Sequence, residues 1–102
     1  MKRWDIINSY VEKYGYKTYL EIGLDSGICW DSVKVDDANK TTVDPSEKTM
    51  NPTHLMTSDT FFAQNKDTFD IIFIDGLHHG DQVLKDIENS LDVLNEGGVI
   101  FC

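Results

Sequence analysis

The stretch Phe69-Asp-Ile-Ile-Phe-Ile74 decides the fold of this chain. Its nearly continuous apolar run has the length of a strand. Such runs are typical of the central strands of a parallel sheet, where helices cover both faces. The segment 81–94 follows with helical spacing, and its apolar stripe comprises Leu84, Ile87, Leu91 and Leu94. Its charged residues Lys85, Asp86, Glu88 and Asp92 fall mostly away from that stripe, so we expect an amphipathic helix.

Strands and helices alternate on either side of this run. A first helix is indicated by Trp4, Ile7, Val11 and Tyr14 at helical spacing, with Gly15 as its C-terminal cap. The other predicted strands are 18–22, 40–44, 54–57 and 99–101, and the shorter predicted helices are 26–35 and 58–64. Strand 54–57 is the weakest, because only eight residues separate Asp44 from Thr53, fewer than a parallel crossover usually takes. The pattern predicts one α/β domain, residues 1–102, with a Rossmann-like parallel sheet of about five strands and flanking helices.

Composition narrows the possible partners. The formal net charge is −9, from 18 acidic and 9 basic residues, and such a surface repels phosphate backbones and anionic lipid. We therefore expect neither a nucleic-acid nor a membrane partner. No apolar run reaches the roughly 20 residues of a membrane span, and the N-terminus lacks a secretory signal. Cys29 and Cys102 have no metal-type spacing, which favours free thiols and a cytoplasmic location.

Candidate site residues come from the ends of the predicted strands. In an open parallel sheet the ligand crevice lies at the carboxyl ends of the strands, near the point where the strand order reverses. Acidic residues follow three strands in succession, and a nucleoside has hydroxyl and amine donors to match them. The residues at these ends are Glu21, Gly23, Asp25, Gly27, Asp44, Ser58, Asp59, Asp75 and His78.

The glycine loop Glu21-Ile-Gly-Leu-Asp-Ser-Gly27 is a weak signal by itself. It lacks the middle glycine of the dinucleotide fingerprint, which argues against an NAD-binding domain, and it is also compatible with an ordinary strand-to-helix turn. Asp44 strengthens the cofactor interpretation, because it stands 21 residues after Gly23, at the end of the second strand. That spacing is typical of an acidic residue that binds a ribose.

Several motifs together resemble one family, the class I S-adenosylmethionine-dependent methyltransferases. Tyr19-Leu-Glu-Ile-Gly23 resembles motif I, and Val43-Asp-Pro45 resembles the acidic motif of the second strand. A bacterial and viral subgroup, similar to sugar and small-molecule O-methyltransferases, is matched closely by three further segments. These are Met56-Thr-Ser-Asp59 with Phe61-Phe62, then Phe73 to His79 with Gln82 to Leu91, and finally Asn95 to Ile100.

The resemblance implies a role for each matched residue. Gly23 and Gly27 would face the methionine part of the cofactor, Asp44 its ribose, and Ser58 with Asp59 the adenine edge. Asp75-Gly-Leu-His78 looks like the Asp-x-x-His motif in which the Asp binds a divalent metal, here Mg²⁺, and the His is the general base. From the residues alone, Asp75 and His78 could equally be a helix N-cap and a turn histidine. His79 and His54 are better explained as structural or solvated.

The family pattern also implies a further half. Complete members continue beyond the fifth strand with more metal-binding acidic residues, two more strands and the acceptor pocket, and this chain stops near Cys102. Two functions stay open: a methyltransferase acting on a small-molecule or sugar hydroxyl, or a catalytically incomplete module that holds the nucleoside. An edge strand at 99–101 would favour a homo-oligomer or a partner that completes the sheet.

Overall fold

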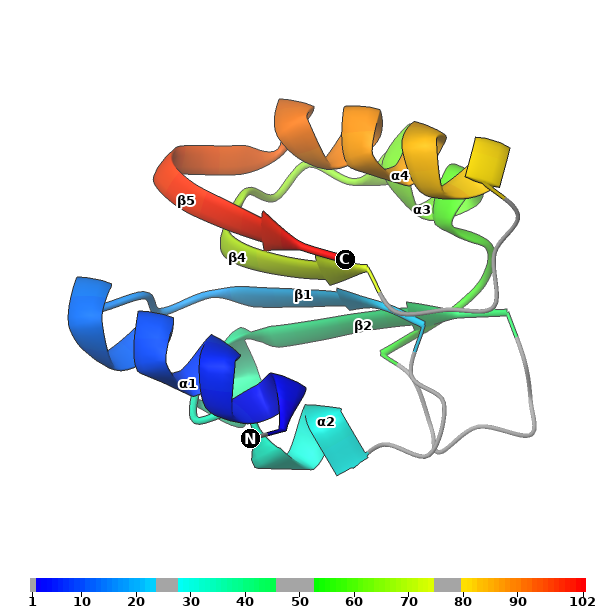
Figure 1. The fold of residues 1–102 in the computed structure, drawn as a ribbon. Helices are drawn as coiled ribbons and strands as arrows, with labels where there is room; N and C mark the ends of the chain where they lie inside the picture. The colour runs from blue at the N-terminus through cyan, green and yellow to red at the C-terminus, as the bar shows by residue number, and fades with distance from the viewer. Residues whose placement is uncertain (1, 24–27, 46–52, 75–79) are drawn as a thin grey trace.

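The structure, a computed structural model, describes residues 2–23, 28–45, 53–74 and 80–102. It has three layers, with a twisted sheet between two pairs of helices (Figure 1). The strands are β1 (Tyr19–Ile22), β2 (Lys40–Asp44), β3 (His54–Leu55), β4 (Phe69–Ile74) and β5 (Leu94–Phe101). The helices are α1 (Arg3–Tyr14), α2 (Ile28–Ser32), α3 (Ser58–Gln64) and α4 (Gly80–Asp92), with a 3₁₀ turn at Asp37–Asn39. None of the helices in the described ranges has both the length and the apolar character needed to cross a membrane.

All the strand pairs of the sheet are parallel, and the strand order is β3-β2-β1-β4-β5. The chain moves outward from β1 through β2 to β3, then returns to the other side of β1 for β4 and β5. The expected Rossmann-like parallel sheet of five strands with flanking helices is therefore confirmed. The order reverses between β1 and β4, which places the switch point of the sheet at the ends of these two strands.

Each face of the sheet has its own apolar core. Alternate strand residues point to opposite faces. Leu20, Ile22 and Ile72 pack under α3 and α4, whereas Tyr19, Ile71 and Phe73 pack against α1 and α2. Figure 1 shows α1 and α2 on one side of the sheet and α3 and α4 on the other. Double coverage explains why the run from Phe69 to Ile74 is apolar almost throughout.

Three predicted segments fold with the expected bounds. The bounds of β2, α3 and β4 agree with the prediction residue for residue. The first helix also ends as expected, because Gly15 has a φ of 68° and its N–H donates to the carbonyl of Val11. Strand β3 has only two residues, Val43 pairing with His54 and Asp44 with Leu55, so the prediction of a strand through residue 57 was too long.

Strand β5 begins five residues earlier than predicted. Leu94 pairs with Phe69 and Val99 with Ile71, so the register shifts between these pairs and β5 bulges. Gly97 has a φ of 81°, and a Cβ on Gly98 would lie 2.4 Å from the backbone oxygen of Asp70. These two glycines allow the strand to bulge, whereas the sequence prediction treated them as the end of a linker.

Helix α4 is rotated away from the predicted orientation. Ile87 does pack on the core, but Leu84 and Leu91 of the predicted stripe are 57% and 60% exposed. Asp86, which was predicted to fall away from the stripe, is fully buried, as is Ser90. A hydrogen bond from Ser58 of α3 to Asp86 holds this polar face toward the protein. The two leucines therefore turn outward, and this part of the prediction was wrong.

Asp70 joins three strands at the amino end of the sheet. Its carboxylate accepts hydrogen bonds from the backbone N–H groups of Lys17, at 2.8 Å, and Thr18, and from the Asn95 side chain, at 2.9 Å. Burial acts to raise the pKa of Asp70, but these hydrogen bonds to its charged form outweigh it and lower the pKa below the usual 3.8. The carboxylate thus holds the segment before β1, β4 and β5 in register.

We expect Asp70→Ala to lower the free energy of unfolding by about 2 kcal/mol at pH 7, because several hydrogen bonds to a charged acceptor disappear. A lowered pKa in the folded state means that this contribution is complete above the ordinary pKa of the carboxyl group. It is lost as the pH falls through the folded value. Urea unfolding of both proteins between pH 7 and pH 3 measures this, with Asp67→Ala as the control. A difference that does not shrink in acid would contradict the assignment.

Strand β5 and the exposed leucines of α4 also predict self-association. An edge strand offers unpaired backbone groups to another chain, and exposed apolar side chains add to the attraction. The charge of −9 opposes association, most strongly at low salt. We expect dimers or larger species at micromolar protein in high salt, and a shift toward monomer in Leu84→Ser/Leu91→Ser. Leu55→Ser, at an exposed position on the opposite edge, is the matched control. Sedimentation as a sharp monomer at both salt concentrations would refute the prediction.

Candidate functional site

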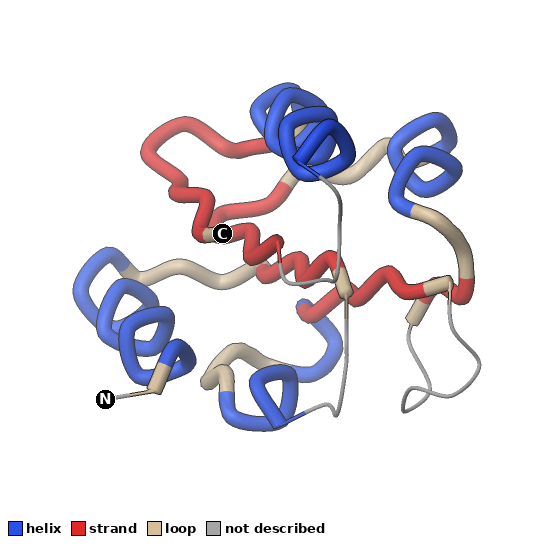
Figure 2. Tube along the Cα trace, turned by 45° about the vertical axis from the view of Figure 1, so that its right-hand side comes forward, coloured by secondary structure: helices blue, strands red, loops and turns tan. Residues whose placement is uncertain are grey.

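The described ends of β1, β2 and β3 are joined at one edge of the sheet. The N–H of Gly23, directly after β1, donates to the carbonyl of Val43 at 2.8 Å, and the N–H of Met56 donates to the carbonyl of Asp44 at 3.1 Å. Ser58, the first residue of α3, follows two residues later. Figure 2 shows the short loop that leads from β3 to the start of α3. Gly23, Asp44 and the start of α3 are thus brought to the edge where the sequence predicts a ligand crevice.

Gly23 and Asp44 fit the predicted crevice in conformation as well as position. Gly23 has a φ of 90°, a left-handed value that favours glycine and leaves the backbone open to close approach. Asp44 ends β2 with a side chain that is 7% exposed. A carboxylate at a parallel strand end has the acceptor oxygens to bind the hydroxyl groups of a ligand.

Glu21 lies deeper than the sequence indicated. Its side chain is fully buried on the α1–α2 face, where the Tyr19 hydroxyl donates to its Oε1 at 2.5 Å. Burial, and then the nearby charge of Glu21, raise the pKa of the Cys29 thiol to about 12. The same two causes raise the pKa of the Tyr19 hydroxyl far above its usual value. Tyr19 and Cys29 therefore stay protonated beside the carboxylate. The direct contact of Glu21 with a cofactor stays a prediction.

Ser58 and Asp59 are engaged by helix α4. The Ser58 hydroxyl donates to Asp86 Oδ1 at 2.6 Å, and Lys85 Nζ lies 3.1 Å from Asp59 Oδ2. The Gln82 amide nitrogen shares its two hydrogens among three acceptors, Asp86 Oδ1 at 2.9 Å, Ser58 Oγ at 3.2 Å and Asp59 Oδ1 at 3.3 Å. Hydrogen bonds from Gln82 and Lys85 lower the pKa of Asp59, so this carboxyl group is ionised at neutral pH.

Three of the predicted site residues, Gly27, Asp75 and His78, lie outside the described residues, as do Asp25 and His79. In the ranges that the structure describes, no group of three or more His, Cys, Asp or Glu side chains is placed to hold a metal ion. Mg²⁺ binding by Asp75 therefore stays a prediction. Cys29 and Cys102 are both free thiols, the first buried and the second exposed.

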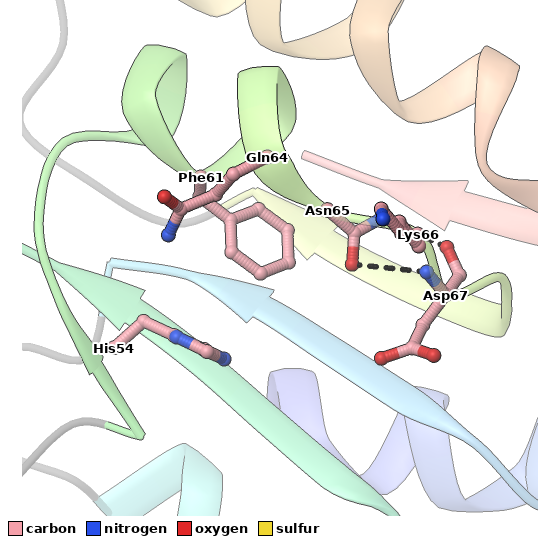
Figure 3. A pocket seen from close by; sticks show the side chains of 6 residues that line it. All are labelled: His54, Phe61, Gln64, Asn65, Lys66 and Asp67. Atoms are coloured by element: carbon pink, nitrogen blue, oxygen red, sulfur yellow. Dashed lines mark hydrogen bonds between the residues drawn. The ribbon is translucent and has the colours of Figure 1, made fainter.

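A separate hollow of about 460 Å³ lies along α3, away from these residues. Figure 3 shows His54 of β3 and Phe61 of α3 lining it, with Asn65, Lys66 and Asp67 toward the start of β4. The rings of His54 and Phe61 are 5.2 Å apart, and Asn65 Oδ1 accepts a hydrogen bond from the N–H of Asp67. His54 thus has an aromatic packing partner, in agreement with the structural role predicted for it. The hollow includes none of the predicted cofactor residues.

Sequence reasoning missed the residues that support the site from neighbouring elements. Gln82 and Asp86 are one helical turn apart, on the same face of α4, and this spacing was the available signal. Tyr19 and Glu21 alternate onto the same face of β1, which could have indicated a buried polar pair. The contact of Tyr19 and Glu21 with Cys29 joins β1 to α2, and residue spacing in the sequence could not predict it.

The fold and the strand order define an α/β domain with a Rossmann-like parallel sheet, in which the order reverses between β1 and β4. Residues 20–102 match a family described as a methyltransferase domain, and the chain therefore belongs to this family. No curated protein sequence matches it significantly.

Among solved structures, the O-methyltransferase from Bacillus cereus in complex with SAH is similar, with a TM-score of 0.71 at 19% sequence identity. The match covers 96% of this chain and 54% of that chain, so this chain spans about half the length of the solved enzyme. At this identity the likeness establishes the fold. It agrees with the expected partial methyltransferase fold.

Proposed function

We propose that this domain binds S-adenosylmethionine and takes part in methyl transfer to the hydroxyl group of a small molecule or sugar. One observation supports this most directly. The N–H of Gly23 is hydrogen-bonded to the carbonyl of Val43, which brings Gly23 next to Asp44 in a chain of the methyltransferase family. The similar Bacillus cereus O-methyltransferase was solved with SAH, the product form of that cofactor.

The described residues fit such a cofactor. Asp44 can accept both hydroxyls of a ribose, and the ionised Asp59 can accept the exocyclic amine of adenine. The left-handed backbone of Gly23 leaves room for the methionine portion, which Gly27 would contact further along the loop. Glu21, held by the Tyr19 hydroxyl at the end of β1, is a supporting residue in this proposal.

The bound cofactor would supply an activated methyl group, and the chain would orient the acceptor and remove its proton. By resemblance, His78 is the general base, since an imidazole of ordinary pKa near 6.5 is available to accept a proton at neutral pH. Asp75 would bind the adenosine part of the cofactor or a Mg²⁺ ion that lowers the pKa of the acceptor hydroxyl. The acidic surface suits a small neutral acceptor better than nucleic acid.

The second candidate function is a module that binds the nucleoside without catalysis. It is favoured by one observation, that this chain spans 54% of the solved enzyme. For the catalytic function, we propose that a second copy or another chain pairs with β5, completes the sheet and contributes to the acceptor pocket. A cytoplasmic location agrees with the two free thiols.

We expect the 102-residue chain to bind S-adenosylhomocysteine and Asp44→Ala to weaken binding about 30- to 150-fold. Loss of two charge-assisted hydrogen bonds costs about 2–3 kcal/mol. Isothermal titration calorimetry measures both affinities. Asp36→Ala, an exposed carboxylate near the other end of β2, should bind like the wild type. Equal affinity of Asp44→Ala and wild type would dismiss the ribose assignment, and tighter binding of NAD would point to a different Rossmann domain.

We further expect the isolated 102-residue chain to show little or no methyl transfer. Transfer of the labelled methyl group from S-adenosylmethionine is measured in the presence of Mg²⁺, with a panel of compounds that have sugar or catechol-type hydroxyl groups. Robust turnover by a verified monomer that is lost in His78→Ala would contradict this expectation and establish the enzymatic function of the chain alone. Binding without turnover is expected both for the module and for a methyltransferase domain that needs further structure for catalysis.

A further inference from the structure

We propose that Gln82 and Asp86 of α4 are positioning residues for nucleobase recognition, because they fix Ser58 and Asp59 where the amine of a bound adenine would be recognised. This inference rests on the proposed function and deepens it. It assigns a role to α4, a helix outside the set of predicted cofactor residues.

The geometry of the contacts fixes both side chains at the start of α3. The Ser58 hydroxyl donates to Asp86 and accepts from Gln82, so its rotation is determined by two partners. Asp59 is held at both oxygens, Oδ1 by Gln82 and Oδ2 by Lys85. We name these five residues, Ser58, Asp59, Gln82, Lys85 and Asp86, the α3–α4 polar network.

Asp59 keeps the capacity to bind a ligand within this network. Its side chain is 44% exposed, and each carboxylate oxygen has a second lone pair for a further donor. Ser58 is different, because it is 7% exposed and its only hydroxyl proton is used by Asp86. Asp59 is therefore the side chain that meets the adenine amine, whereas Ser58 is a link between α3 and α4.

The buried carboxylate of Asp86 is explained better by positioning than by stability. It lies at 0% exposure on a helix whose other inward residues include Ile87, and an apolar side chain could fill that place at lower desolvation cost. A buried carboxylate instead imposes a fixed donor geometry on its neighbours. Because the orientation of Asp59 is set before a ligand arrives, less side-chain freedom is lost on binding.

The test compares two ligands that differ only at the base. S-adenosylhomocysteine has an amine at the 6-position, and its inosine analogue has an oxo group there, which a carboxylate repels. We expect wild type to prefer the adenine ligand, and Gln82→Met and Asp86→Asn to reduce the ratio of the two dissociation constants about fivefold. Calorimetry gives the ratio, and circular dichroism confirms that each variant is folded.

Two controls separate positioning from general damage. Glu88→Gln removes one charge from the exposed face of the same helix and should leave the ratio unchanged. Asp44→Ala should weaken both ligands equally, because both share the ribose. Should Asp86→Asn fail to fold, Gln82→Met and Lys85→Met supply the same measurement.

The outcomes are distinct. A wild type that binds neither ligand overturns the proposed function and this inference with it. A wild type that binds S-adenosylhomocysteine, with network variants that weaken both ligands by the same factor or leave both unchanged, overturns the positioning role alone. A loss of base preference confined to the network variants supports it.

Discussion

Burial of β1 on both faces is the constraint on which the rest of this structure depends. All four of its residues are buried, and it pairs with β2 on one side and β4 on the other. Leu20 and Ile22 fill the core beneath α3 and α4, so the opposite face must accommodate Tyr19 and Glu21. A buried carboxylate is tolerated only with partners, and the Tyr19 hydroxyl supplies one at short range. The central strand thus combines apolar packing with one buried polar pair directly before the glycine loop.

The same strand sets the location of the site. Parallel strands present their carboxyl ends at one edge, and the order of this sheet reverses beside β1. Gly23 therefore leaves the sheet next to Asp44 of β2, and the backbone contact between Asp44 and Met56 leads on to α3. The parallel topology by itself brings these polar strand ends to one edge of the sheet. The amino edge has a structural role instead, where Asp70 connects β1, β4 and β5.

Polar side chains between the helices have a second organising effect. On the α3–α4 side, contacts from Gln82 and Asp86 determine which face of α4 turns inward. The cost is visible at the surface, where Leu84 and Leu91 remain more than half exposed. The molecule therefore places ordered polar contacts beside its predicted cofactor residues and leaves apolar area near an edge strand. Both features are consistent with a domain of the methyltransferase family that functions together with further structure.

The sequence by itself determined the fold class, the alternation of strands and helices, and the bounds of β2, α3 and β4. The apolar run of β4 and the short segments β2 and α3 are local features of the sequence, so these elements could be predicted without knowledge of tertiary contacts. Predicted site residues such as Asp44 followed from their place at strand ends. Only the tertiary structure decided the bulge in β5, the burial of Glu21 and the rotation of α4. Each of these depends on contacts between segments far apart in the chain: Asp70 against Gly98, Cys29 beneath Glu21, and Ser58 against Asp86. Helical spacing predicted that Leu84 points inward and Asp86 outward. The prediction was wrong because the periodicity of apolar residues contains no information about Ser58, a hydrogen-bond partner on another helix.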